Sequence, residues 1–185
     1  MSDMSEHVLA DSPRRRTASR FRPTALLLVP LAAILFQVYL PRFIEYLGYL
    51  ELPLLVTVYF ALMRRAPVAG TLIGMGIGLC QDSLSAHPLG MFGIVKTLIG
   101  YFAASVSQRF DVENPAIRLL LGFFFFLFHQ FFYWVLASAL LGQEMVFDVG
   151  QTLVLAVLNG AVALPIYLLL DKLREDDQAA IAVPY

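Results

Sequence analysis

A short polar stretch, GLCQDSLSAHPLG at residues 78–90, interrupts a chain that is apolar on both sides of it. It holds a carboxylate, two hydroxyls and an imidazole, which are the side-chain types of a nucleophilic hydrolase: Asp82, Ser83, Ser85 and His87. A catalytic triad needs side chains that converge in space, each orienting the next, and neighbours within one turn rarely do so. The chain also has no GxSxG, HExxH or Walker A motif, so we expect no enzymatic activity.

Three polar residues lie deep within apolar segments: Lys96, His129 and Asn159, with Gln130 beside the histidine. Counted from the segment ends, they lie roughly 12 to 18 Å below the outer surface at about 1.5 Å per residue. One interpretation is an intramembrane pocket for an anion, and the other is a packing network in which Lys96 reaches outward to water. The network is favoured, because the carboxylates nearest to the lysine are expected at the outer surface: Asp82, Glu144 and Asp148.

Three glycines repeat at every fourth position in one apolar segment: Gly70, Gly74 and Gly78. Small residues at this spacing share one face of a helix and let a second helix approach closely. The second helix belongs either to this chain or to a partner protein, and packing within the chain is favoured. Cys80 is the only cysteine, so we expect neither an intramolecular disulfide, nor a zinc-type site, nor a cofactor.

The elements that position these residues are membrane helices. The chain of 185 residues is 59% hydrophobic and only 15% charged, whereas a soluble domain has about 25% charged residues. The segment from Leu119 to Leu141 contains no charged residue, and it is long enough to cross a bilayer. The sequence therefore predicts an all-α bundle with six spans, at 24–40, 52–63, 66–82, 88–108, 116–141 and 150–171.

The basic residues set the topology. With six crossings and a cytoplasmic N-terminus, 11 of the 13 basic residues lie on the cytoplasmic side, as the positive-inside rule requires. If the short second span did not cross, the arginines at 64, 65, 109 and 118 would lie outside. Residues 43–52 can extend this span along the interface. We therefore predict a basic cytoplasmic tail at 1–23, a six-helix domain at 24–172 and a cytoplasmic tail at 173–185. The outermost residues, 1–20 and 175–185, are expected to be poorly ordered.

Residues 59–110 resemble the MreD family of rod shape-determining membrane proteins. The resemblance rests on YFALMRRAPVAG at 59–70, on GIGLCQDSLS at 76–85 and on PLGMFGIVKTLIGYFAASVSQRF at 88–110. The residues that match the family pattern are Asp82, Pro88, Leu89, Gly90, Gly100 and Tyr101, while Phe92 stands where many members carry histidine.

The resemblance implies a non-enzymatic component of the bacterial cell-elongation machinery in the cytoplasmic membrane. Its implied partners are MreC, a single-span periplasmic scaffold, and through it RodA, the associated transpeptidase and MreB filaments. Membrane lipid surrounds the protein, and nucleic acid is not among the expected partners. The family is similar in fold to the six-span substrate-binding subunits of energy-coupling vitamin transporters, so the alternative function is a small-molecule-binding transport subunit. That alternative is less favoured, because the short outer loops carry few polar groups for a ligand.

The polar stretch itself is then predicted to be an outer turn between two helices. Asp82 ends the first helix, Ser85 is expected to cap the second, and Pro88 suits its first turn. An acidic side chain beside a helix N-terminus is also favourable.

Overall fold

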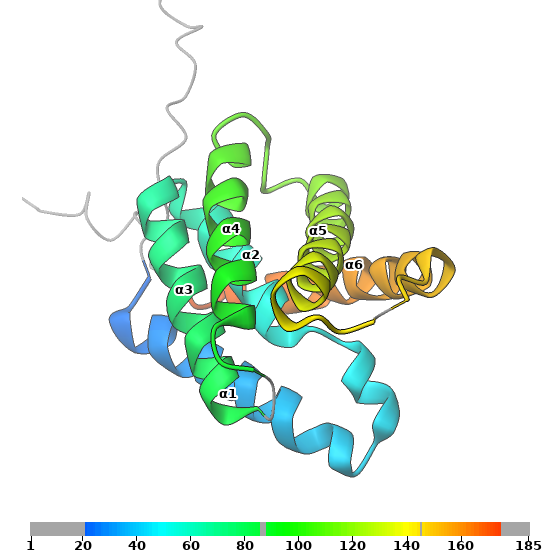
Figure 1. Ribbon diagram of the computed structural model, residues 1–185. Helices are drawn as coiled ribbons and strands as arrows, with labels where there is room; N and C mark the ends of the chain where they lie inside the picture. The colour runs from blue at the N-terminus through cyan, green and yellow to red at the C-terminus, as the bar shows by residue number, and fades with distance from the viewer. Residues whose placement is uncertain (1–20, 86–87, 145, 175–185) are drawn as a thin grey trace, which may run out of the picture.

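The computed structural model describes residues 21–85, 88–144 and 146–174, and these form six α-helices joined by short connections (Figure 1). The helices are α1 (Pro23–Tyr39), α2 (Leu52–Arg64), α3 (Pro67–Leu84), α4 (Met91–Val106), α5 (Pro115–Leu141) and α6 (Val149–Asp171). Two short 3-10 helices, η1 (Leu40–Arg42) and η2 (Glu45–Tyr49), lie between α1 and α2. Each α-helix lies within a few residues of the apolar segment that predicted it. His87 and the outer parts of both predicted tails fall outside the described residues.

Local sequence signals fix the helix ends. Four helices, α1, α2, α3 and α5, have proline in the first turn, where its missing N–H is not needed. The side chain of Asn114 accepts a hydrogen bond from Ala116 N (2.9 Å) at the start of α5, and Asp148 accepts one from Gln151 N (3.0 Å) at the start of α6. Gly142 ends α5 with φ of 61°, a left-handed conformation that glycine adopts without strain.

Helix α2 forms the centre of the bundle. It contacts each of the other five α-helices, and every residue from Pro53 to Met63 is buried. Its 13 residues are short for a crossing, but η2 lengthens the apolar segment to 20 residues, Glu45–Arg64. The second span is therefore a core helix with an extended lead-in, as residues 43–52 suggested.

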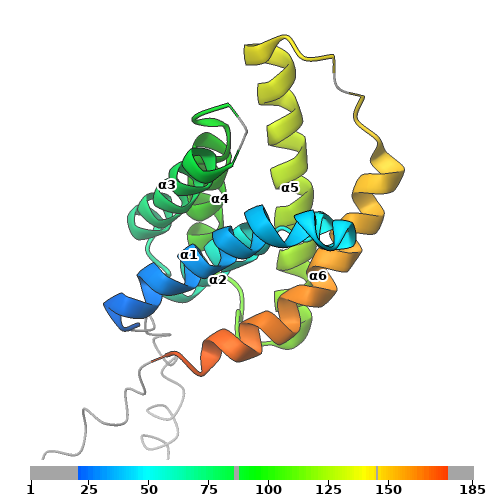
Figure 2. The ribbon, with the colours of Figure 1, turned by 90° about the horizontal axis from the view of Figure 1, so that it is seen from below.

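The remaining helices form two closely packed pairs, α3 with α4 and α5 with α6. Seen in Figure 2, α5 and α6 lie together over one half of their length and diverge toward the 142–148 connection. A cavity of about 230 Å³ lies in the diverging half, between α5 and the start of α6.

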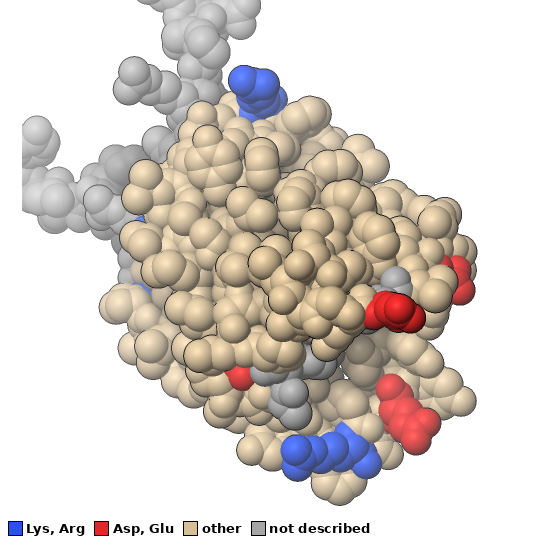
Figure 3. Space-filling view, in the orientation of Figure 1, with Lys and Arg blue, Asp and Glu red and all other residues tan. Residues whose placement is uncertain are grey.

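The protein is a membrane protein with a largely apolar surface. Within the described residues, four segments are long and apolar enough to cross a bilayer: Pro23–Arg42, Glu45–Arg64, Pro115–Leu141 and Val149–Asp171. Helix α4 is shorter, with 16 residues, and α3 is not among the four, so the six-crossing topology remains a prediction. In Figure 3 the visible face is almost free of charged side chains, which lie at its rim.

Candidate functional site

The polar stretch of residues 78–90 forms a turn organised by one carboxylate. Asp82, buried near the end of α3, accepts three backbone hydrogen bonds from the start of α4. Its Oδ2 accepts from Gly90 N (3.0 Å) and Gly93 N (2.9 Å), and its Oδ1 accepts from Phe92 N (3.0 Å). These N–H groups have no partner within α4, so Asp82 caps that helix from the preceding one and places a negative charge at its positive end.

The predicted role of Ser85 is wrong. Helix α3 runs past Asp82 to Leu84, and Ser85 ends it by donating a hydrogen bond from Oγ to the Gln81 carbonyl (2.6 Å). The N-cap position of α4 is instead Gly90, whose φ of 97° suits glycine and which has no side chain to offer. Pro88 precedes this position and so does not lie in the first turn of α4.

The glycine face of α3 packs against α4 within this chain. A Cβ on Gly70 would meet the Gly100 carbonyl, and one on Gly74 or Gly78 would meet the backbone of Lys96 or Phe92. All three α3 glycines are buried, so this face has no surface left for a partner helix. Close backbone approach gains dispersion contacts where lipid offers little hydrophobic drive.

Lys96 lies wholly inside the bundle and does not reach outward to water. Its side chain is 0% exposed, and its Nζ lies 4.4 Å from the centroid of the Phe92 ring. An ammonium over an aromatic face gains cation–π attraction, which is strongest where water is excluded. Nζ has no hydrogen-bond partner among the described residues.

Glu51 is a further carboxylate near Lys96, besides those expected from the sequence. Asn159 fastens the start of α2 inside the bundle: its Oδ1 accepts from Glu51 N (2.9 Å) and its Nδ2 donates to the Tyr49 carbonyl (2.9 Å). The Glu51 carboxylate is thereby within electrostatic reach of Lys96.

His129 packs against the same aromatic ring. Its imidazole stacks on Phe92 with centroids 5.8 Å apart and an interplanar angle of 8°, and Tyr133 stacks on Phe92 in turn at 5.3 Å. Both ring nitrogens of His129 are buried without a partner among the described residues. Lys96, Phe92 and His129 thus form one cluster, and Asn159 joins it through Glu51.

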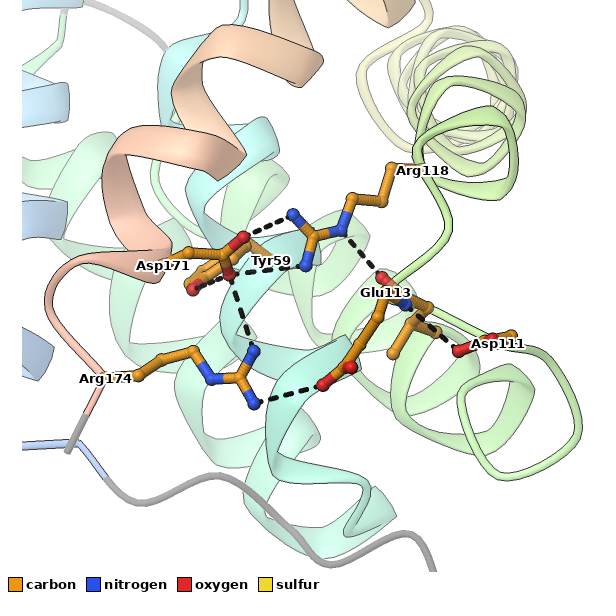
Figure 4. Close-up of polar contacts among 7 residues, drawn as sticks. Tyr59, Asp111, Glu113, Arg118, Asp171 and Arg174 are labelled. Atoms are coloured by element: carbon orange, nitrogen blue, oxygen red, sulfur yellow. Dashed lines mark hydrogen bonds and ion pairs between the residues drawn. The ribbon is translucent and has the colours of Figure 1, made fainter. Parts of the chain in front are cut away.

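A second polar group ties the opposite end of the bundle together (Figure 4). Arg118 at the start of α5 is 4% exposed, donates from Nε to the Val112 carbonyl (2.7 Å) and pairs with Asp171 at the end of α6 (2.5 Å). Tyr59 of α2 donates to the same carboxylate (2.8 Å), and Arg174 bridges it to Glu113. Three helices, α2, α5 and α6, therefore meet at one aspartate.

The sequence matches a family model described as rod shape-determining protein MreD, over residues 19–174. The chain belongs to the MreD family. No curated protein and no solved structure matches it, so the similarity in fold to vitamin transporter subunits gains no support. The match spans all six helices, the Asp82 turn and both polar groups.

Within this MreD-family chain, the family-pattern residues divide by location. Asp82 and Gly100 are buried at the α3–α4 contact, whereas Leu89 and Tyr101 are 76% and 48% exposed. The buried pair holds two helices together, and the exposed pair is available to lipid or a partner. Among the described residues, no three histidine, cysteine or acidic side chains gather as a metal site.

Sequence reasoning missed Glu51, Tyr59 and Asp171. Glu51 follows an apolar run and stands two residues before a proline, so the sequence predicts a loop carboxylate. In the structure Asn159 accepts a hydrogen bond from its backbone N–H. Asp171 stands beside Lys172 at a helix end, where a solvated charge is the ordinary expectation. The sequence gives one indication that Asp171 is an ion-pair partner. Arg118 lies at the start of an apolar helix, and it needs a counter-charge if that helix packs tightly.

Proposed function

We propose that this MreD-family protein is a non-enzymatic membrane scaffold of the bacterial cell-elongation complex, and that it holds an MreC-like single-span protein beside the bundle. Through that protein it would join RodA, its transpeptidase and MreB filaments, and so direct peptidoglycan synthesis and rod shape. The family match over residues 19–174 carries the proposal. The helices also leave much apolar surface exposed around the bundle, including Phe124 (50%) and Phe131 (47%) on α5, which suits lipid and helical partners.

We also propose that all six helices cross the cytoplasmic membrane, with both termini on the cytoplasmic side. One end of the bundle holds the starts of α1 and α5 and the ends of α2 and α6. Phe21, just before α1, pairs with Arg174, just after α6, and Arg118 of α5 pairs with Asp171 of α6. Most described basic residues lie at this end, which supports its cytoplasmic location under the positive-inside rule. The shorter α4 and the glycine-rich α3 would cross as a tightly packed pair shielded by α2.

Complementation tests the function. The full chain is expressed in a rod-shaped bacterium whose own MreD-family protein is depleted, and cell width and length are measured. Wild type is expected to restore rods, as is Gly76→Ala, because a Cβ at Gly76 meets nothing within 4 Å. Round cells despite normal membrane levels of the chain would contradict the proposal.

A further inference from the structure

An apolar groove of about 350 Å³ lies between α1 and α3. The buried side chains of Ile34 and Ile77 line it, as do the exposed side chains of Leu31 (41%) and Leu72 (56%). Gly76 lines it too, and a Cβ at this position would meet nothing within 4 Å. Because α1 packs mainly against α2, the space between α1 and α3 is left to an apolar occupant.

The length of this groove matches one leaflet of a bilayer. Its lining runs from Leu26 to Ile34 on α1 and from Leu72 to Cys80 on α3, which is about 12 Å of each helix at about 1.5 Å per residue. The hydrocarbon core of a bilayer is about 30 Å thick, so one leaflet supplies about 15 Å. A partner helix that crosses the bilayer would need a groove about twice as long, whereas an acyl chain reaches only to the midplane.

Arginines lie near the end of the groove at which α1 and α3 begin. Arg22 stands one turn before Leu26, whose N–H donates a hydrogen bond to the Arg22 carbonyl (3.3 Å). Arg64 ends α2 and lies one turn beyond Phe60, whose ring centroid is 5.2 Å from that of Phe21. Both arginines are therefore close to the start of α1, where they favour a negatively charged headgroup.

We propose that the groove between α1 and α3 binds one acyl chain of an anionic phospholipid, whose phosphate lies beside Arg22 and Arg64. The apolar lining and its length select the chain, and the arginines select the charge of the headgroup. The lipid belongs to the cytoplasmic leaflet, a point that rests on the orientation given under the proposed function. The bound chain completes the packing of α1 against α3.

Native mass spectrometry of the full chain tests the selection of the headgroup. The chain is reconstituted in nanodiscs of equal parts phosphatidylglycerol and phosphatidylcholine, and the lipid that stays bound after release is identified by mass. Phosphatidylglycerol should be retained about fivefold or more over phosphatidylcholine, the factor expected for one arginine near an anionic headgroup. Arg22→Gln should lower this preference about fivefold, whereas Arg42→Gln, beyond the other end of α1, should leave it unchanged.

The position of the acyl chain is tested by filling the groove. Gly76→Phe should abolish lipid retention, whereas Val68→Phe, at a position of the same helix that is 75% exposed and outside the groove, should not. Wild type provides a check that does not depend on the folding of a variant. A phosphatidylglycerol with a diazirine at mid-chain, retained by the purified chain, should cross-link to residues 26–34 and 72–80 well above α5 and α6.

Two results would overturn the proposal. Lipid retained without a preference between the headgroups would refute the role of the arginines. Cross-links that avoid residues 26–34 and 72–80 would show that protein, such as a second copy of the chain, fills the groove instead. The nanodisc has the same lipids in both leaflets, so the assay does not depend on orientation or on complementation. Rod-shaped cells together with no retained lipid would refute the lipid site alone, whereas retained lipid in a chain that fails complementation would refute only the scaffold function.

Discussion

Replacing Asp82 by alanine should destabilise the bundle more than any comparable change at its surface. The carboxylate accepts hydrogen bonds from three backbone N–H groups, those of Gly90, Phe92 and Gly93. Phe92 and Gly93 are buried, so alanine would leave two N–H groups without water or protein partners. Each such group costs about 1–3 kcal/mol, and loss of the charge at the helix N-terminus adds about 0.3–1 kcal/mol. The expected loss in free energy of unfolding is about 4 kcal/mol in total. The N–H of the half-exposed Gly90 adds little to it.

Asp82→Asn separates charge from hydrogen bonding. The amide keeps one acceptor oxygen of similar shape but loses the charge and one acceptor, so the expected cost is about half, near 2 kcal/mol. Ser83→Ala is the matched control on the same helix. Its exposed hydroxyl bonds only to a carbonyl of its own helix, and surface changes of this kind stay within about 0.5 kcal/mol.

The assay is reversible unfolding of the purified chain in mixed micelles, combined with amide hydrogen exchange. Asp82→Ala should lower the free energy of unfolding and speed exchange at Phe92 and Gly93, because those amides lose their acceptor. A variant within about 1 kcal/mol of Ser83→Ala, with both amides still protected, would refute the capping role of Asp82.

Three further changes test the other contacts in the same unfolding assay. Gly100→Ala should cost about 1–3 kcal/mol by overpacking, since its Cβ would meet a backbone carbonyl of α3, while Gly76→Ala should be neutral. Asp171→Ala should lower the free energy of unfolding by about 3 kcal/mol. This is the low end for a broken buried ion pair, because the aspartate is 26% exposed. A variant as stable as wild type would contradict the pairing. Lys96→Met and Glu51→Gln should each lower the free energy of unfolding. The double variant should lower it by about 1 kcal/mol or more less than the sum of the two single effects. Strictly additive effects would show that the two charges do not interact.

The helices were predictable because their signals are local. Apolar runs, first-turn prolines and terminal glycines placed every helix within a few residues, and the glycine spacing marked the face of α3 that packs on α4. The Asp82 turn was predictable only in part. The sequence placed an acid beside the start of a helix but assigned the cap to Ser85, because the αL turn at Gly90 sets where α4 begins and only the fold places Asp82 against it.

The polar cluster depended on contacts distant in sequence. Lys96, His129 and Asn159 were singled out by their depth, yet their counter-charge could not be identified from spacing. Glu51 and Asn159 are 108 residues apart and meet only because α2 and α6 pack in one bundle. The same holds for Arg118 and Asp171, which are 53 residues apart.

Binding of an MreC-like protein tests the central proposal most directly. The full chain is co-expressed with a single-span MreC-like protein from the same genome, extracted from the membrane and purified by a tag on the chain alone. A stable complex of defined stoichiometry in nanodiscs is expected, and it should be lost when the span of the partner is replaced by an unrelated apolar helix. Recovery of the folded chain without the partner, in detergent and in nanodiscs alike, would contradict the scaffold function.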